Sequence, residues 1–517
     1  MPNPESTDST ARKPYVNIPR GFTYKMNSTA SQLDRNKSLA IMSASMLMAI
    51  LFGLISTTAN VIVISITIAV FAGAFLLVRP VWIVWIVMSM GLLVVGIVPL
   101  YNIGLDTKAG WAVSIMCFAL MPLALFKVAT TKSVRKDTPA FIWLLLGFLV
   151  YALLNSLVQW HSAEQYVGSL KRYFQMWGLL FSLCWLVFDE RHIRRWQMFF
   201  MFTALLQLPF AVYERIVWVP LREAIRDSIP GMVPIDVVAG TFGSTLYGGG
   251  SSGEMSTFLV IVVAFLLARK MQKTITAGRL MLLIPWVLGP LSIGETKAVV
   301  VMLPLMFLVL YRRELLARPH YGVMALAFCI LLTVCMGYAY LAIMHTTFDS
   351  LVAETLKYNL YEQGYGENYL NRTTVLTFWA AHQGADDPVS FMFGNGLGSS
   401  HQQTRGHIDI LYPGYGIGLT AASTLLWDTG VFGCSLFIAV FTLAWRTAGQ
   451  LFRESNEPTV RADATAIQVA LSLFIFHIFY RLDLLETVSY QIVFASVLGY
   501  LAWLHRRHAV SMAGSLP

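Results

Sequence analysis

Apolar runs long enough to cross a lipid bilayer recur along this chain, and they limit its possible folds more than any other feature. A transmembrane helix needs roughly 17 to 25 mostly apolar residues, and about fourteen runs near this length are present, a few of them shorter. They lie near 38–56, 59–78, 81–100, 109–127, 140–159, 173–188, 196–213, 254–268, 278–293, 297–311, 321–345, 419–445, 464–480 and 485–504. Of the 517 residues, 56% are hydrophobic and only 13% are charged. We therefore expect an all-α, polytopic transmembrane helical bundle of about 12 to 14 spans.

The basic residues between the runs predict the orientation of the chain. Connections rich in Lys and Arg stay on the cytoplasmic side of a membrane. If the N-terminus is inside, every strongly basic connection falls on that side, including 127–136, 191–195 and 269–279. We therefore predict a multi-pass membrane protein with cytoplasmic N- and C-termini.

The spacing of the runs divides the chain into parts. The predicted parts are a polar cytoplasmic tail (1–37), transmembrane helices with a periplasmic loop near 214–253 (38–345), a large periplasmic loop (346–418), the C-terminal transmembrane helices (419–504) and a second cytoplasmic tail (505–517). The large loop contains helical spacing near 348–361 and 369–383, so we expect it to be partly helical. Long connections between short ones are where function is expected.

Charge and cysteine usage argue against several classes of function. The formal net charge is +9, but Lys and Arg occur in short clusters between apolar runs, so we expect no nucleic-acid partner. All five cysteines lie inside apolar runs, where a thiol is usually a small hydrophobic group. No histidine has a companion at the spacing of zinc ligands. We predict no disulfide, no metal site and no cofactor.

Basic residues on the predicted outward side are exceptions to the charge rule. A cation at the edge of a span needs an anionic or polar partner, and arginine can bind phosphate oxygens in pairs. The predicted substrate-binding residues, which would hold a diphosphate or a glycan, are Lys171, Arg172, Arg215, Lys297, Arg372, Arg405 and Arg481. Purely structural alternatives stay open: Lys297 could pair with Glu295, and Arg172 could anchor the start of a span.

Groups able to transfer a proton lie on the same predicted face. His401 and His407 follow the glycine-rich turn G394-N-G-L-G398, and an imidazole there could remove a proton from a hydroxyl near neutral pH. The alternative is that both are solvated loop histidines. Further groups of this kind are His161, Glu164, His382, Asp409, Asp428, Asp483 and Glu486.

Four short passages, in this order and between these spans, carry a family resemblance. They are V238-A-G-T-F-G-S244, G294-E-T-K297, N371-R372 followed by F393-G-N-G-L-G398, and L425-L-W-D-T-G-V-F-G433. Together they resemble the O-antigen ligase and polysaccharide polymerase family of bacterial membrane proteins. Members of that family transfer glycans from an undecaprenyl diphosphate carrier outside the inner membrane.

The resemblance is incomplete at two positions. Lys297 stands where the family has an arginine, and Leu419 stands where the ligases have a histidine, although Asp428 occupies the acidic place. The ligase-type histidine therefore cannot be carried over, and His401 or His407 would have to replace it. This difference favours a polymerase over a ligase.

The resemblance implies a metal-independent, inverting glycosyl transfer at the periplasmic face of the bacterial inner membrane. Arg372 would be catalytic because it would stabilise the leaving diphosphate, and a base in the large loop would activate the acceptor hydroxyl. The implied partners are an undecaprenyl-diphosphate-linked glycan, membrane lipid and other components of polysaccharide export.

Other functions stay open at this point. One is ligase-type transfer to lipid A core or another acceptor, and a second is a flippase for lipid-linked oligosaccharides, which predicts two similar halves and charged residues in mid-span. A third is a membrane-bound O-acyltransferase that uses His477 as its buried histidine. Glycosyl transfer instead predicts charges clustered at the outer boundary of the spans.

Overall fold

The long apolar runs of the sequence form helices in a computed structural model of the protein. The structure describes residues 79–98, 106–228, 234–247, 249–294, 296–320, scattered positions within 322–341, 347–359, 368–384 and 387–514. These residues belong to one unit, Arg79–Pro517. Their secondary structure is helical, and the only β pairing within them is an isolated bridge between Ser244 and Gly250. The predicted spans 38–56 and 59–78, and much of the span 321–345, lie outside the described residues.

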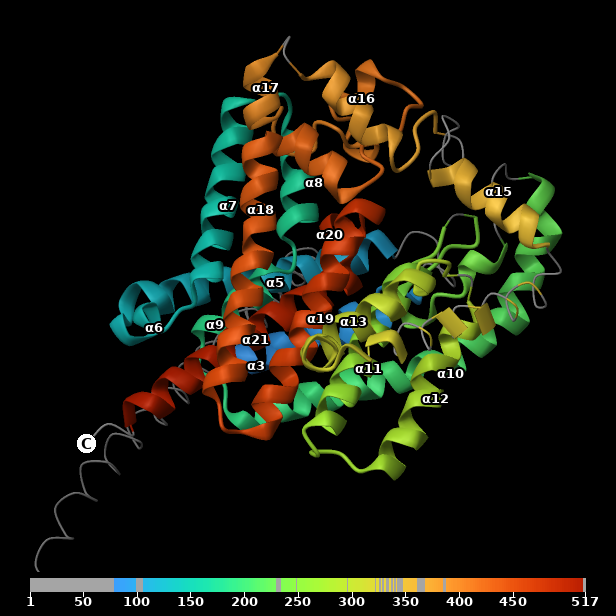
Figure 1. The fold of residues 1–517 in the computed structure, drawn as a ribbon. Coiled ribbons are helices and arrows are strands. Elements are labelled where there is room, and N and C mark those ends of the chain that lie inside the picture. The colour runs from blue at the N-terminus through green and yellow to red at the C-terminus, as the bar shows by residue number, and fades with distance from the viewer. Residues whose placement is uncertain are drawn as a thin grey trace, which may run out of the picture. The chain divides into compact units, whose positions relative to one another are not determined.

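Seven of the described helices are long and apolar enough to cross a membrane, which confirms the expected all-α, polytopic bundle (Figure 1). They are α5 (Asp106–Thr130), α7 (Ala140–Val158), α10 (Glu190–Ile225), α11 (Ser252–Met271), α18 (Ala421–Glu454), α19 (Pro458–Tyr480) and α21 (Val488–Gly514). Three further apolar helices are α3 (Pro80–Ser89), which continues as a π-helix over Met90–Val94, α12 (Ala277–Ile293) and α13 (Val299–Ala317).

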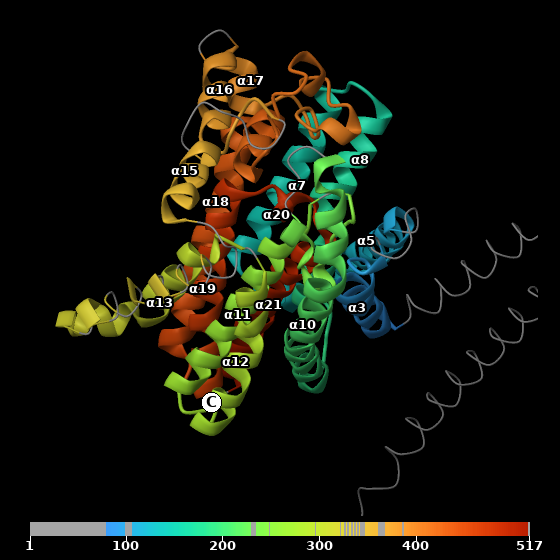
Figure 2. The ribbon, with the colours of Figure 1, turned by 90° about the vertical axis from the view of Figure 1, so that its right-hand side faces the viewer.

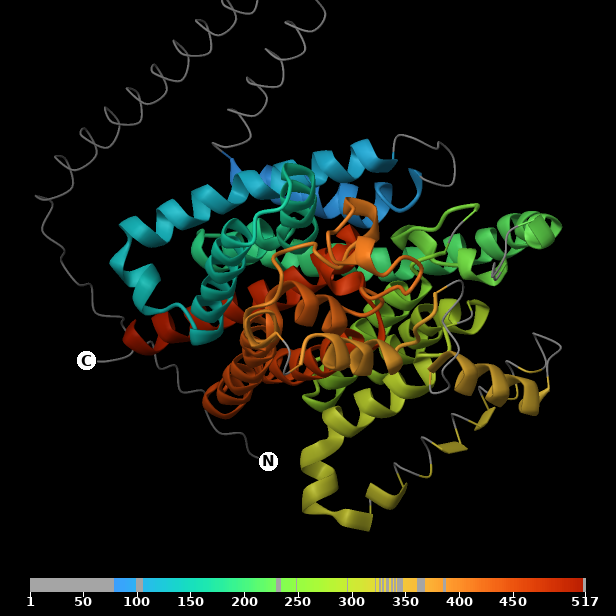
Figure 3. The ribbon, with the colours of Figure 1, turned by 90° about the horizontal axis from the view of Figure 1, so that it is seen from above.

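Burial separates central helices from peripheral ones. In α11, 83% of the most apolar segment is buried inside the protein, compared with 28% in α10. The peripheral helices turn large apolar side chains outward, such as Phe126, Leu154 and Phe202. Seen from above, the C-terminal helices (red) lie between the blue-to-cyan helices and the green ones (Figure 3). Apolar side chains on the outer surface are expected where hydrocarbon is the solvent.

The structure differs from the predicted spans in two places. The predicted span 173–188 is two helices, α8 (Ala163–Phe174) and α9 (Trp177–Trp185), and α9 is too short to cross a membrane by itself. Helix α10 continues to Ile225, so the loop predicted near 214–253 begins later than expected. Good helix formers such as Glu214, Leu221 and Glu223 allow this extension.

Helix α18 is broken near one end by Gly430, whose backbone has φ +64° and ψ −174°. The carbonyl groups at the break are bonded by side chains of α7, because Tyr151 donates to Thr429 O (2.8 Å) and Asn155 Nδ2 donates to Asp428 O (3.2 Å). A broken helix inside a membrane protein needs such replacement partners.

The described part of the large loop contains the helices that the sequence predicted. These are α15 (Phe348–Asn359) and α16 (Thr374–His382), and the loop adds α17 (Pro388–Phe393). A small core of Leu370, Val375, Trp379 and Ile417 packs against Trp427 at the start of α18. Helices α16 and α17 thus cover the ends of α7 and α18 (Figures 1 and 2).

Candidate functional site

Several of the predicted functional residues gather at one end of the bundle, which we call the site end. It is formed by α8, by the short helix α20 (Asp483–Glu486), by the first turn of α11 and by the described part of the large loop. Figure 1 shows α8 and α20 beside the start of α18, below the loop helices. These segments are far apart in the sequence.

Three side chains from three of these segments meet as a cluster, the Arg–His–Glu cluster (Arg172, His401 and Glu486). Arg172 Nη1 lies 2.9 Å from Glu486 Oε1, and His401 Nε2 hydrogen-bonds to the same carboxylate oxygen. Arg172 Nη1 also contacts the His401 ring, and its Nη2 donates to Gln403 Oε1 (2.8 Å). The Glu486 side chain keeps 28% of its surface exposed, whereas His401 is buried. The Glu486 side chain is therefore the most exposed of the three side chains in the cluster.

The hydrogen bonds indicate where the protons are. His401 Nδ1 accepts the backbone N–H of Gln403 (3.1 Å), so Nε2 carries the ring proton and donates it to Glu486. Burial disfavours the ionised form of Glu486, but His401 and Arg172 outweigh burial and hold the pKa of Glu486 below its ordinary value. Glu486 is thus an ionised carboxylate and a proton acceptor.

The turn 394–401 places His401, and a buried carboxylate holds this turn. Asp428 is fully buried and accepts hydrogen bonds from the backbone N–H of Gly398 (2.7 Å) and of Ser400 (3.1 Å). It also accepts from the Ser399 and Ser400 hydroxyls and from Tyr173 OH (2.8 Å), the neighbour of Arg172 in sequence. Asp428 therefore joins the segment that carries His401 to the helix that carries Arg172.

Arg481 links α20 to α11 and α18. Its Nε lies 2.6 Å from Asp483 Oδ2 and its Nη1 lies 3.3 Å from Glu254 Oε2. A Cβ at Gly253 would lie 2.7 Å from Arg481 Nη1, so glycine permits this close approach. The Arg481 carbonyl accepts the N–H of Ala421 at the start of α18 (3.0 Å). This predicted substrate-binding residue therefore already has two carboxylate partners within the chain.

Arg372 and Lys297 lie at the same end of the bundle. Arg372 Nε donates to the carbonyl of Tyr480 (2.9 Å), and its guanidinium lies 4.2 Å from the centre of the Tyr480 ring. The turn before Lys297 is attached to α11, because Ser256 Oγ donates to Thr296 Oγ1 (2.9 Å). Both cations are half-buried.

The other predicted site residues are more scattered. Lys171 Nζ lies 4.8 Å from the Trp111 ring, and burial together with the charge of Arg172 lowers the pKa of Lys171. The His407 ring stacks on His161 with centres 4.8 Å apart; burial, then His161, lowers the pKa of His407. Lys171 therefore points toward α5 although it is next to Arg172 in the sequence, and His407 faces the start of α8.

Arg405 and Arg215 are placed differently again. Arg405 is exposed and has a left-handed backbone, with φ +48°. Arg215 is half-buried on α10. The hydrogen bonds and ion pairs of the described residues do not join either side chain to the Arg–His–Glu cluster.

The carboxylates of the site end were less visible in the sequence. The sequence suggests Glu486 and Asp483 only as two of several candidate proton-transfer groups, and Glu254 is not one of these candidates. The available signal was their position, because S252-G-E254 opens an apolar span and D483-L-L-E486 lies between two spans. A carboxylate at such a boundary needs a partner, and here the partners are Arg481, His401 and Arg172.

The glycine-rich loop 238–243 uses its backbone amides inside the protein. Glu214 Oε2 accepts the N–H groups of Ala239 (3.0 Å) and Gly240 (2.7 Å), and Gln207 Oε1 accepts the N–H of Thr241 (2.9 Å). Gly240 has φ +59°, and a Cβ there would lie 2.1 Å from Gln207 Oε1. This loop is therefore attached to α10.

Comparison with models of known protein families gives no match for this chain, and comparison with curated proteins gives none either. The geometry of the site end, together with the four sequence passages, is therefore the basis for inferring function.

Proposed function

We propose that this protein is a membrane-embedded glycosyltransferase of the polysaccharide polymerase type. It would transfer a glycan from a polyprenyl diphosphate carrier to a sugar hydroxyl at the site end. The observation that carries the proposal is the Arg–His–Glu cluster, an ionised carboxylate held by Arg172 and His401 at the boundary of the spans. Ionisable groups concentrated at such a place are typical of functional sites.

In this proposal Glu486 is the base. It takes the proton of the acceptor hydroxyl while the oxygen attacks the anomeric carbon of the donor sugar. The bond from that carbon to the diphosphate oxygen breaks, and the diphosphate leaves with the electron pair. A single displacement of this kind inverts the anomeric configuration. His401 would orient Glu486, and its ring proton favours the ionised carboxylate.

The cations of the site end suit an anionic leaving group. The described cations at this end include Lys171, Arg172, Lys297, Arg372 and Arg481. Preorganised positive charge stabilises a diphosphate as it departs. We assign this contact to Lys297 and Arg372, which are half-buried at this end of the bundle.

The charge distribution supports the proposed orientation. Basic connections such as 191–195 and 269–279 lie at the end of the bundle opposite to the site end, as the helix directions of α10 and α11 require. By the positive-inside rule, the site end would face the periplasm of a bacterial inner membrane, with the C-terminus in the cytoplasm.

The proposal is tested by deleting the protein in its native host and analysing lipid-linked glycans. Single repeat units that accumulate on the carrier would support a polymerase, whereas full-length chains that stay unattached would indicate a ligase. Complementation with Glu486→Gln should not restore product although protein is present, and Glu164→Gln, a carboxylate at the start of α8, is the matched control. Wild-type product from Glu486→Gln would exclude Glu486 as the base.

A further inference from the structure

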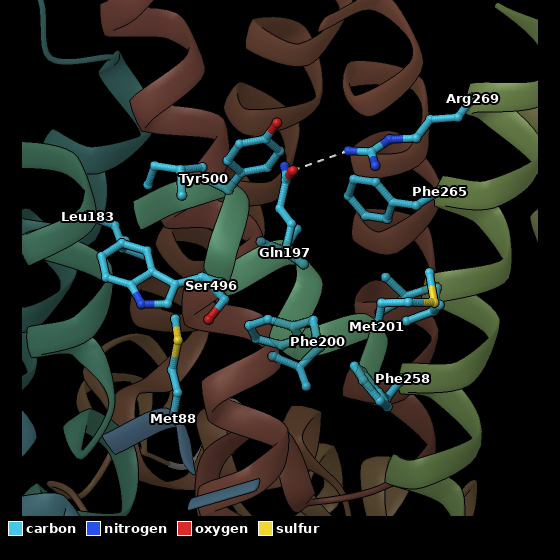
Figure 4. A pocket seen from close by; sticks show the side chains of 16 residues that line it. Met88, Leu183, Gln197, Phe200, Met201, Phe258, Phe265, Arg269, Ser496 and Tyr500 are labelled. Carbon is cyan, nitrogen blue, oxygen red and sulfur yellow. Dashed lines mark hydrogen bonds between the residues drawn. The ribbon is translucent and has the colours of Figure 1, made fainter. Parts of the chain in front are cut away.

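A cavity of about 140 Å³ lies among α10, α11 and α21. It is farther from the site end than the Arg–His–Glu cluster is. Figure 4 shows Phe200 and Met201 of α10 facing Phe258 and Phe265 of α11, with Met88 of α3 nearby. Most of its wall is therefore aromatic and aliphatic.

One end of this cavity is polar. Arg269, Gln197 and Tyr500 line that end, away from Phe258 (Figure 4). Arg269 pairs with Asp463 through Nε and Nη2, at 2.9 Å each, and Tyr500 OH donates to Asp463 Oδ2 (2.7 Å). The positive charge of the guanidinium is therefore balanced by Asp463, and the cavity does not require an anionic ligand.

The position of the cavity along α11 decides which molecules can reach it. With 1.5 Å per residue, Phe258 lies about 9 Å and Arg269 about 26 Å along the axis from Ser252 at the site end. The hydrocarbon core of a bilayer is roughly 30 Å thick, so the apolar part lies at membrane depth. At that depth the surrounding solvent is hydrocarbon.

We propose that this cavity binds a segment of one hydrocarbon chain of a membrane lipid. An apolar cavity of about 150 Å³ stays dry and accepts a benzene-sized molecule, so this one encloses about six carbon atoms of a longer chain. An empty space of this size would forfeit the van der Waals contacts of its aromatic lining. The proposal does not depend on glycosyl transfer.

Two sources can supply such a chain. One is the acyl chain of a phospholipid, and the other is the isoprenoid chain of a polyprenyl carrier. Both present linear hydrocarbon to the same wall. The full-length protein is reconstituted in vesicles of phosphatidylethanolamine and phosphatidylglycerol that contain either a phospholipid with a diazirine in its acyl chain or a polyprenyl phosphate with a diazirine. After irradiation, the labelled residues are mapped by mass spectrometry.

We expect labelling of Phe200 and Phe258 in at least one arm, and the labelled arm identifies the source. Val262→Phe fills the cavity from α11, so the hydrocarbon chain can bind only if the core is overpacked. This cost weakens binding of the chain, and we expect labelling at these two residues to fall about tenfold. Labelling of the outward-facing Leu154 should not change. Val150→Phe, on the exposed surface of α7, is the matched control.

The result that overturns the proposal is equally specific. Absence of labelling at Phe200 and Phe258 in both arms, or labelling that Val262→Phe leaves unchanged, excludes a bound chain. If Val262→Phe does not elute as a folded protein in size-exclusion chromatography, Val497→Leu replaces it, since Val497 lines the same cavity from α21.

Discussion

The turn 394–401 and the loop 238–243 are each folded around one buried carboxylate from a long helix. Asp428 of α18 uses both of its oxygens, and one of its donors is Tyr173 of α8. Glu214 of α10 uses Oε2 for two backbone amides, and its Oε1 has no hydrogen-bond partner among the described residues. The first carboxylate connects its turn to the Arg–His–Glu cluster, whereas the second attaches a loop to one helix.

This difference shows why glycine content alone does not identify a ligand site. Both segments contain glycines with positive φ, and glycine lets a backbone approach a ligand closely. In the structure, side-chain carboxylates of the protein occupy both. A turn of this kind matters for function when it positions a residue of the site. Only the turn 394–401 positions a residue of the cluster.

The largest expected effect comes from removing the carboxylate with the most partners. Asp428→Ala leaves buried donors on the turn 394–401 without an acceptor, which should lower the free energy of unfolding by about 3 to 5 kcal/mol. Glu214→Ala, with fewer donors, should cost about 1 to 3 kcal/mol. Thermal unfolding of the purified proteins measures both losses of unfolding free energy. Equal losses would show that the two carboxylates contribute equally to stability.

A smaller structural change separates the two segments by function. Gly398 has φ +75°, and a Cβ there would lie 1.7 Å from Ser169 Oγ, so Gly398→Ala should displace the turn and abolish product. Gly240→Ala has a left-handed backbone cost of about 1 to 2 kcal/mol, and its Cβ would meet Gln207 Oε1, so it should disturb the loop 238–243 but no residue of the cluster. Product measured in complemented cells should persist for Gly240→Ala. Loss in both variants would place the loop 238–243 in the site as well.

The pH dependence sharpens the role that we assign to the turn. His401 and Arg172 outweigh burial and lower the pKa of Glu486, so this ionised form is favoured above the ordinary glutamate pKa and is lost as pH falls through the lowered value. The acid limb of activity should therefore lie below the ordinary range for glutamate. His401→Gln should move that limb to higher pH, measured as transfer rate against pH in vesicles. An unmoved limb would show that Glu486 does not set it.

The smallest expected effect is at Arg405, which follows the same turn. Its side chain is exposed, so Arg405→Ala should change the free energy of unfolding by less than about 0.5 kcal/mol. Product should also be retained, because the described contacts do not join Arg405 to the cluster. Loss of product at unchanged stability would support the substrate contact that the sequence suggested, and Arg446→Ala at the far end of α18 is the control.

The sequence predicts the spans well because each depends on local composition. The run 140–159 appears as α7 (Ala140–Val158), and 278–293 appears as Ala277–Ile293. The break between α8 and α9 was not predicted, since K171-R-Y-F-Q-M-W177 has no proline or glycine to indicate it. A helix break that depends on tertiary contacts has no local signal.

The site was only partly predictable for the same reason. Arg172 is predicted from its charge at the outer boundary and His401 from its place after the glycine-rich turn, and the structure brings them together with Glu486. The contact from Arg172 to Glu486 joins residues 314 positions apart, so spacing in the sequence cannot reveal it. Arg481 is predicted to bind the substrate, but its partner Glu254 comes from another span.

The break at Gly430 has a mechanical consequence. Trp427 belongs to the core of the large loop, and Asp428 holds the turn that carries His401. The segment 421–429 is thus joined to the loop and to the turn 394–401. A change in the backbone angles of Gly430 would therefore shift His401 relative to the longer part of α18.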